Sequence, residues 1–208
     1  MNNFIEILTE CRLFLGVDRD NLFKMIGCLG AKTKKFTKDQ FILSEGNEAK
    51  YIGVVLSGEA QIIRTDLFGN RTILARVVPS QLFGESFACA DIKSIPINVV
   101  ATSDCEVMLI DAKRITQTCN GACAFHNKMI YNLLKVVAEK NIIFHEKIEI
   151  TSKRTTREKL MTYLQIQAKK EGNSTFDIPF ARQDLADYLE VERSGLSVAV
   201  SYTHLRAH

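Results

Sequence analysis

The sequence contains no tryptophan, only three prolines and no long uninterrupted run of apolar residues. A helix that crosses a membrane needs roughly 18 consecutive apolar residues, so no membrane span and no membrane partner are expected. The beginning of the chain also lacks a basic segment followed by an apolar stretch, which is the pattern of a secretory signal peptide. These absences predict a cytoplasmic protein.

The chain also has little net charge, +3 over 208 residues, with 46% hydrophobic and 25% charged residues. This composition is ordinary for a folded globular protein. Nucleic-acid binding cannot be inferred from so small an excess, because it needs a concentrated basic surface. No phosphate-binding GxxxxGK segment, Ser-His-Asp set or paired carboxylates can be identified, so we do not expect an enzyme.

None of the six cysteines forms a CxxC pair, which argues against a zinc ribbon or a thioredoxin-like motif. Cys119, Cys123 and His126 are spaced four and three residues apart, so they share one face at the start of a predicted helix. They are a weak candidate for a metal site or a thiol sensor. The alternative is that these cysteines are simply buried thiols, because no fourth ligand lies nearby. We therefore predict no metal and leave the cofactor unknown.

Short apolar stretches separated by glycine-containing turns dominate the first half of the chain. Strands are predicted at Gln40–Leu43, Tyr51–Leu56, Ala60–Thr65, Arg71–Val77 and Val99–Ile110. Strands of this length, spaced about ten residues apart, are typical of a small antiparallel barrel or sandwich. Together with the helices described next, they predict an α+β fold.

The pattern changes to a helical period between about Thr118 and Ile150. Residues that advance by alternating steps of four and three form a seam along one side of a helix of about 28 residues: Cys123, Asn127, Ile130, Leu134, Val137, Asn141, Phe144 and Ile148. Such a seam predicts a homodimer in which Asn141 pairs with its symmetry mate and fixes the register. The alternative is that the helix packs on its own barrel and Asn141 is solvated.

An amphipathic helix around Leu160, Tyr163, Leu164 and Ile166 or Gln167 is followed by the sequence RQDLADYLEVERSGLS, residues 182–197. This segment reads as two short helices around a tight turn, with Ala186 as the small residue where the helices touch. The first helix should end at Leu189 or Glu190, and the second should begin near Arg193. Glu190 falls at a turn position that usually requires the left-handed conformation. A plain helical hairpin would show the same apolar spacing, so the segment alone is ambiguous.

The order of these segments resembles the cyclic-AMP receptor protein and fumarate-nitrate regulator (Crp/Fnr) family of bacterial transcription factors. The resemblance covers about Phe4 to Ser197 and is carried by SGEAQI (Ser57–Ile62), FGES (Phe83–Ser86) and RQDLADYLEVERSGLS. It implies a double-stranded β-helix over residues 1–117, a jelly-roll barrel of the kind that binds cyclic nucleotides. A dimerisation helix over 118–149 and a winged helix-turn-helix over 150–208 would follow.

The resemblance also implies partners and site residues. A homodimer would bind double-stranded DNA at a palindromic operator and would contact RNA polymerase. The implied DNA-binding residues are Arg182, Gln183, Arg193, Ser194 and Ser197. The implied site for an unknown small-molecule effector comprises Gly84, Glu85, Ser86 and Lys93.

Two departures from the family pattern qualify these expectations. Members that bind cyclic nucleotide carry Arg-Ser where this chain has Ile95 and Pro96, so the phosphate loses its cationic partner and cyclic AMP is not expected as the effector. Lys93 is the alternative cation. Val198 stands where the family has a second base-reading Arg, and the following residues differ from the family, which suggests a truncated end with an incomplete wing. The alternative function is therefore a ligand-binding or interaction module that does not bind DNA.

Overall fold

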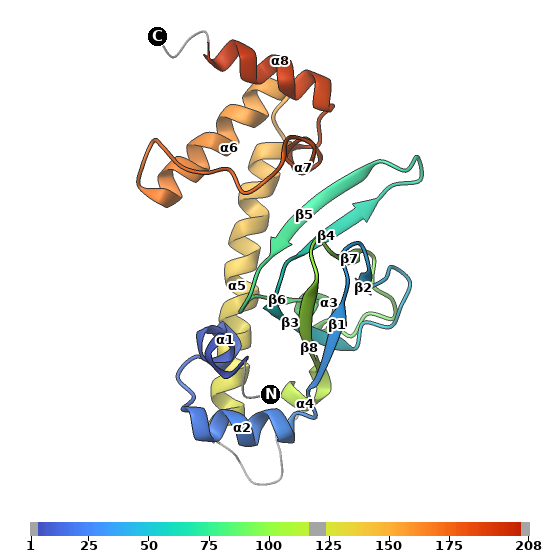
Figure 1. Ribbon diagram of the computed structural model, residues 1–208, viewed down its shortest axis with the longest axis vertical. Coiled ribbons are helices and arrows are strands. Elements are labelled where there is room, and N and C mark those ends of the chain that lie inside the picture. The colour runs from blue at the N-terminus through green and yellow to red at the C-terminus, as the bar shows by residue number, and fades with distance from the viewer. Residues whose placement is uncertain (1–3, 117–123, 205–208) are drawn as a thin grey trace. The chain divides into compact units, whose positions relative to one another are not determined.

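A computed structural model of the chain describes residues 4–116 and 124–204. The chain divides into two compact units (Figure 1). The N-terminal unit comprises Met1–Thr65 and Leu74–Glu139, and the C-terminal unit comprises Asp66–Ile73 and Lys140–His208. Within the described ranges, no helix has the length and apolar character that a membrane crossing requires.

The described strands form two four-stranded sheets, with orders β1-β8-β3-β6 and β2-β7-β4-β5. Their bounds are β1 Lys32–Phe36, β2 Phe41–Leu43, β3 Tyr51–Ser57, β4 Ala60–Thr65, β5 Arg71–Val77, β6 Leu82–Phe83, β7 Asn98–Ala101 and β8 Cys105–Asp111. Strands β1 and β3 both pair antiparallel with β8, and β4 pairs antiparallel with β7. The sequence-based prediction of a small antiparallel sandwich is confirmed, and four of its strands lie within one residue of β2, β3, β4 and β5.

The prediction of one strand over Val99–Ile110 is wrong. The structure has two strands there, β7 and β8, joined by a turn at residues 102–104. Asp104 Oδ1 accepts a hydrogen bond of 3.0 Å from Lys38 N, and Thr102 N donates one of 2.9 Å to Glu59 O. These contacts stabilise the turn that carries the chain from one sheet into the other. The polar residues Thr102, Ser103 and Asp104 mark this turn in the sequence, and the prediction of a single strand overlooked them.

Two strands were not predicted, and β1 is the more instructive of them. Its sequence, KTKKF, is rich in lysine, and residues 32–35 are exposed. The strand pairs with β8 from Lys32 opposite Leu109 to Phe36 opposite Cys105 and forms one edge of its sheet. Backbone pairing with a strand about seventy residues away therefore makes β1 a strand, because its own residues have no apolar face. Strand β6 has only two residues.

Alternation along β3 and β8 sends side chains into two apolar cores. Val55, Val107 and Leu109 face the core between the two sheets, together with Phe83, Val99 and Ala101. The intervening residues Ile52, Val54, Met108 and Ile110 face the opposite way, into a second core. This period of two is what a strand buried on both faces requires.

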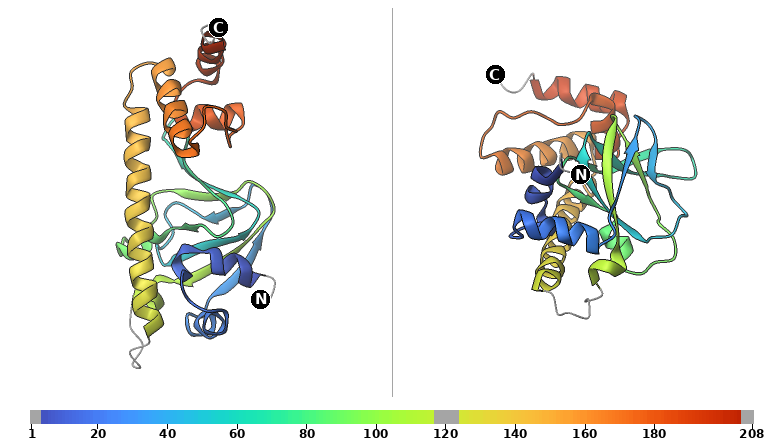
Figure 2. Two further views of the ribbon diagram at one scale, coloured as in Figure 1. Left: turned by 90° about the vertical axis from the view of Figure 1, so that its left-hand side faces the viewer. Right: turned by 60° about the horizontal axis from the view of Figure 1, so that its bottom comes forward.

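Helices cover the second core of the N-terminal unit. They are α1 (Ile5–Glu10), the 3-10 helix η2 (Arg12–Phe14), α2 (Arg19–Cys28), the short helices α3 (Glu85–Cys89) and α4 (Ala112–Thr116), and the first half of α5 (Ala124–Thr151). Met129, Leu133 and Val136 of α5 are buried against this core. Asn132 of α5 donates hydrogen bonds to the carbonyl oxygens of Leu13 and Leu15, at 3.1 and 3.0 Å. The left view of Figure 2 shows α5 as one uninterrupted helix.

The C-terminal unit adds three helices: α6 (Thr156–Glu171), α7 (Arg182–Leu189) and α8 (Arg193–His204). Helix α6 begins with a capping box, in which Thr155 Oγ1 accepts from Glu158 N at 3.2 Å and Glu158 Oε2 accepts from Thr155 N at 3.0 Å. Leu160 and Tyr163, both predicted to mark the apolar side of this helix, are buried. They share a core with residues of α7 and α8: Leu185, Ala186, Leu189, Leu196 and Ala199.

Candidate functional site

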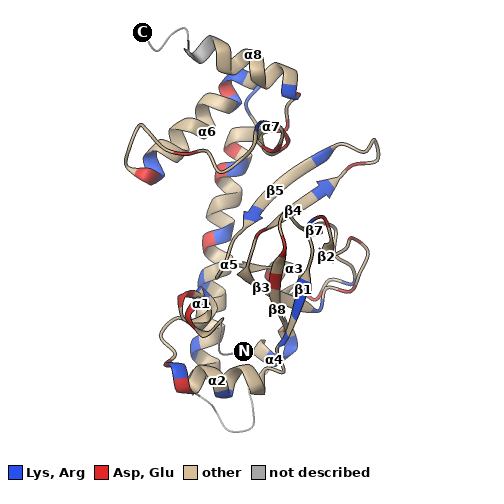
Figure 3. Cartoon of the chain, in the orientation of Figure 1, with Lys and Arg blue, Asp and Glu red and all other residues tan. Residues whose placement is uncertain are grey.

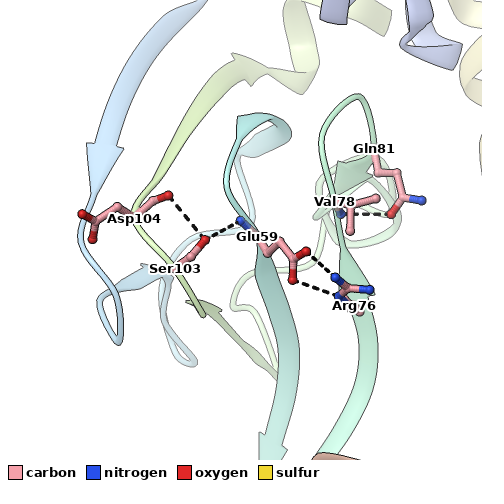
Figure 4. Close-up of polar contacts among 6 residues, drawn as sticks. All are labelled: Glu59, Arg76, Val78, Gln81, Ser103 and Asp104. Carbon is pink, nitrogen blue, oxygen red and sulfur yellow. Dashed lines mark hydrogen bonds and ion pairs between the residues drawn. The ribbon is translucent and has the colours of Figure 1, made fainter. Parts of the chain in front are cut away.

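The SGE motif is a structural turn at the rim of the sandwich. Gly58 has φ +72°, and a Cβ atom there would lie 2.1 Å from the carbonyl oxygen of Asp104, so only glycine fits. Next to it, Glu59 N donates to Ser103 Oγ at 3.0 Å, and the Glu59 carboxylate is held by both Nε and Nη2 of Arg76 (Figure 4). Gln81 Oε1 accepts from Val78 N at 3.2 Å in the same region. These contacts fix the turn, and Arg76 engages the carboxylate of the motif.

The FGES motif forms the start of α3. Gly84 is the N-cap residue with φ +78°, and a Cβ atom there would approach the carbonyl oxygen of Tyr51 to 2.9 Å. Glu85 is only 2% exposed, although it is acidic. Ser86 Oγ lies 3.5 Å from Glu85 Oε1, at the limit of a hydrogen bond. The structure thus brings Gly84, Glu85 and Ser86 together as one turn, with the carboxylate held inside the unit.

Ile95 is part of the sandwich core and not of a polar site. Its side chain is buried in the core that contains Phe83, while its N–H donates to Asn47 O at 2.8 Å and its carbonyl accepts from Gly46 N at 2.9 Å. An arginine at this position would need to leave the core in order to meet a phosphate. Lys93, the alternative cation predicted from the sequence, is exposed. The geometry at residues 93–96 therefore provides no buried cation.

Helices α7 and α8 are joined by a three-residue turn at 190–192, as predicted from the sequence. Helix α7 ends at Leu189 and α8 begins at Arg193. Glu190 adopts the left-handed conformation with φ 55° and ψ 55°. Ala186 is fully buried where the two helices meet, and Val191 N donates to its carbonyl oxygen at 3.1 Å.

The residues predicted to contact DNA lie on the exposed surfaces of these helices. Arg193, Ser194 and Ser197 are exposed on α8, whereas Leu196 and Ala199 are buried on its opposite side. Arg182 and Gln183 are exposed in the first turn of α7, and Gln183 Nε2 donates to Asp187 Oδ1 at 2.7 Å. Exposed Ser201 extends the polar face of α8 by one turn. This face was not extended to Ser201 from the sequence because α8 was not predicted beyond Ser197.

Charge on these helices is mixed. Figure 3 shows basic and acidic residues side by side on α7, where Asp184 and Asp187 follow Arg182. Val198 is 56% exposed on α8, so this apolar side chain occupies surface next to the polar residues. The segment beyond Val198 continues as helix to His204.

One side of α5 is exposed and apolar. Leu134, Phe144 and Ile148 of the predicted seam are 64%, 44% and 61% exposed, and Asn141 lies exposed between them. Ile130 and Val137 are partly buried. The helix also packs on its own unit, but through the different set Met129, Leu133 and Val136. The alternative that α5 packs on its own unit, with Asn141 exposed, therefore agrees with the structure, and the homodimer stays a prediction.

Cysteine chemistry finds little support in the described part of the chain. Cys11 is buried, and burial raises the pKa of its thiol to about 11, which keeps it protonated. Cys119 and Cys123 lie outside the described residues, and His126 is buried on α5. Among the residues whose positions are described, no group of three His, Cys, Asp or Glu side chains is arranged to hold a metal ion.

Comparison with known proteins agrees with this architecture. Residues 33–121 match the family described as the cyclic nucleotide-binding domain. The transcriptional activator protein FnrL of Cereibacter sphaeroides is 22% identical over 177 residues, which are 81% of this chain and 68% of that protein.

Two solved structures show the same fold. FixK2 from Bradyrhizobium japonicum has a TM-score of 0.65 and 21% identity, with 85% of this chain and 86% of that chain covered. The c-di-GMP-responsive global regulator CLP of Xanthomonas campestris has a TM-score of 0.73 and 13% identity, with 91% and 93% covered. The matched domain, the related activator and the shared fold together make the chain similar to transcriptional regulators of the Crp/Fnr type.

Proposed function

We propose that the chain is a cytoplasmic, homodimeric regulator that binds a palindromic DNA operator in response to a small molecule other than cyclic AMP. Residues 1–117 would sense the effector, 118–149 would form the dimer, and 150–208 would bind DNA as a helix-turn-helix. The observation that carries the proposal is the polar face of α8, where Arg193, Ser194 and Ser197 are exposed above a buried apolar core. A short helix held in this way can present its side chains to the major groove.

The direct test is selection of bound sequences from a random duplex library with the full chain. We expect a two-fold symmetric site whose half-sites are about one helical turn, or about 34 Å, apart. Affinity for this site should exceed that for a scrambled duplex by at least about 1,000-fold and should fall steeply with salt. If no sequence were preferred over random duplex, the alternative of a non-DNA-binding module would replace this proposal.

Arg193→Ala tests the role of α8. Loss of a base contact should weaken operator binding by about tenfold or more and relax preference at one base position. Lys169→Ala is the matched control, because Lys169 is an exposed cation in the last turn of α6. It should leave the preferred sequence unchanged. Equal effects of the two variants would argue that Arg193 acts only through its charge.

The dimer proposal rests on the exposed apolar side of α5. A helix with Leu134, Phe144 and Ile148 in water gains free energy when a second copy covers them. We expect sedimentation equilibrium to show a dimer, and Leu134→Glu to weaken it by about 100-fold. Leu67→Glu is the control, because Leu67 is fully exposed on the loop between β4 and β5. A monomeric wild type at high concentration would contradict the proposal.

The effector proposal rests on the buried position of Ile95. A phosphodiester placed near α3 would lack a buried cationic partner there and would lose a charge-assisted hydrogen bond. Calorimetric titration with cyclic AMP should therefore show no micromolar binding. If binding were seen and Lys93→Gln abolished it, Lys93 would be the substitute cation and this part of the proposal would fail. RNA polymerase is the expected further partner of the DNA-bound form.

A further inference from the structure

The loop between β4 and β5, residues 66–70, is a hydrogen-bonded turn that belongs to the C-terminal unit. Asp66 Oδ1 accepts from Phe68 N at 2.8 Å and from Asn70 N at 2.9 Å, and Asp66 N donates to Asn70 O at 3.0 Å. Gly69 follows with φ +83°. These bonds give residues 66–70 a defined conformation. The backbone of Arg71, the next residue and the first of β5, is therefore fixed relative to this turn.

Arg71 binds two carboxylates of α7 at once. Its Nε donates to Asp187 Oδ2 at 2.8 Å, and its Nη2 donates to Asp184 Oδ1 at 2.6 Å. The Asp187 side chain is 12% exposed and that of Arg71 is 39% exposed, so water is excluded from the carboxylate more than from the guanidinium. Burial alone would lower the pKa of Arg71, but the hydrogen bonds and charges of Asp187 and Asp184 outweigh it and raise that pKa. Charge-assisted bonds with this fork geometry fix orientation as well as distance.

Lys147 of α5 holds the same helix from a second side. Its Nζ donates to Tyr188 O in α7 and to Ile73 O in β5, the latter at 3.3 Å, and its side chain is buried. Two cations from two elements, Arg71 and Lys147, therefore bind α7 within residues 184–188. We call these contacts the grip. Asp187 in turn accepts the hydrogen bond of Gln183, one of the proposed DNA contacts.

We propose that Arg71 and Lys147 are positioning residues that set the orientation of the DNA-binding helices within the C-terminal unit. Helices α7 and α8 are packed together, because Leu189 and Leu196 share one core. A shift of α7 at the grip would therefore also shift the polar face of α8. Arg71 is also the first residue of β5, a strand of the sandwich. This inference rests on the proposed function only for its effect on DNA.

The test compares Arg71→Gln with Arg64→Gln in the full chain. Arg64 is an exposed arginine on β4, so both variants lose one positive charge on the same pair of strands. Amide hydrogen exchange of residues 183–190, measured without DNA, reports the grip directly. Arg71→Gln should speed this exchange by about tenfold, whereas Arg64→Gln should leave it within about twofold of the wild type. Arg71→Lys, which can bind one carboxylate, should restore part of the protection.

Operator affinity gives the second readout. In both variants, operator affinity should depend less steeply on salt concentration, and to a similar degree. Arg71→Gln should in addition bind the operator about tenfold more weakly, because its helices are less ordered. Unchanged exchange in Arg71→Gln would overturn the positioning role. If the wild type showed no preferred DNA sequence, the proposed function would fall, and the exchange measurement would still decide for or against the grip.

Discussion

The ammonium group of Lys147 lies 3.8 Å from the centre of the Tyr188 ring. Tyr188 stacks on Phe180 with ring centres 5.0 Å apart and meets the edge of Tyr163 at 5.7 Å. Lys147 is 7% exposed, and its amine lies over the Tyr188 ring of this aromatic group. Burial lowers its pKa to about 8; the carboxylate of Glu190 opposes this shift, and Lys159 adds to it. The cation–π contact and two carbonyl oxygens only partly replace the water it has lost.

This pKa predicts an unusual dependence of stability on pH. The lysine pKa is about 10.4 in the unfolded chain, so between about pH 8 and pH 10.4 the unfolded state binds more protons than the folded state. Stability from this group therefore rises with pH across that window. From about pH 7 to about pH 9.5, the free energy of unfolding of the wild type should gain about 2 kcal/mol relative to Lys147→Met. Urea unfolding at the two pH values measures this difference.

Lys169→Met is the control for that measurement, because Lys169 is exposed. Its free energy of unfolding should differ from that of the wild type by the same amount at both pH values. Burial raises the pKa of Tyr163 to about 12, so this tyrosine stays protonated in the folded protein throughout the range. A difference between wild type and Lys147→Met that did not change with pH would contradict a buried, titrating amine.

Alanine substitutions at Gly58 and Gly69 can distinguish the cost of a steric clash from the cost of a strained backbone. Both have a positive φ, but a Cβ atom at Gly58 would clash with Asp104 O, whereas a Cβ atom at Gly69 would meet nothing within 4 Å. Gly69→Ala should cost about 1 kcal/mol for its left-handed conformation. Gly58→Ala should cost about 3 kcal/mol or more, because the turn between β3 and β4 must also shift. Thermal unfolding of the two variants checks the order.

At Glu190, in contrast, replacement by glycine is expected to raise the free energy of unfolding. Its φ of 55° is strained for a residue with a Cβ atom, and the hydrogen bond it accepts from Lys159 Nζ uses its backbone carbonyl. Glu190→Gly keeps that bond and should stabilise the C-terminal unit by about 0.5–1 kcal/mol. Glu190→Val, with a branched Cβ, should destabilise it. If glycine lowered the unfolding midpoint, the charge of Glu190 would matter more than its backbone.

The capping box of α6 can be tested by removing the hydroxyl of Thr155. Thr155→Ala loses the hydrogen bond from Glu158 N and should lower the free energy of unfolding by about 1 kcal/mol. Thr155→Ser keeps the hydroxyl and should remain close to the wild type. Circular dichroism during urea unfolding measures both variants. Equal stability of the alanine and serine variants would contradict a role for the cap.

Local chemistry made much of this fold predictable. The turn at Glu190 followed from the spacing of Ala186, Leu189 and Leu196, because two helices in contact need a small residue between them. The strands β4 and β5 followed from short apolar stretches between glycine-containing turns. In each case, a few residues close together in the sequence determine the local structure.

Long-range pairing was the part that the sequence concealed. Strand β1 has no apolar face, so only its partner β8 identifies it. The two sides of α5 were also hard to separate, because Met129 and Val136 lie one position away from Ile130 and Val137 of the predicted seam. Arg71 looked like an ordinary strand residue, since its carboxylate partners are more than a hundred positions further along the chain. The burial of Ile95, in contrast, agrees with its apolar character.

The lysines of β1 bear on how copies of the chain can meet. A strand at the rim of a sheet exposes unpaired amide groups, which invite strands of other molecules and lead to fibre-like stacking. Lys32, Lys34 and Lys35 place like charges along that rim, so two such rims repel each other. Self-association is thereby discouraged through the sheet. The proposed dimer through α5 would then form without competition from strand pairing at this edge.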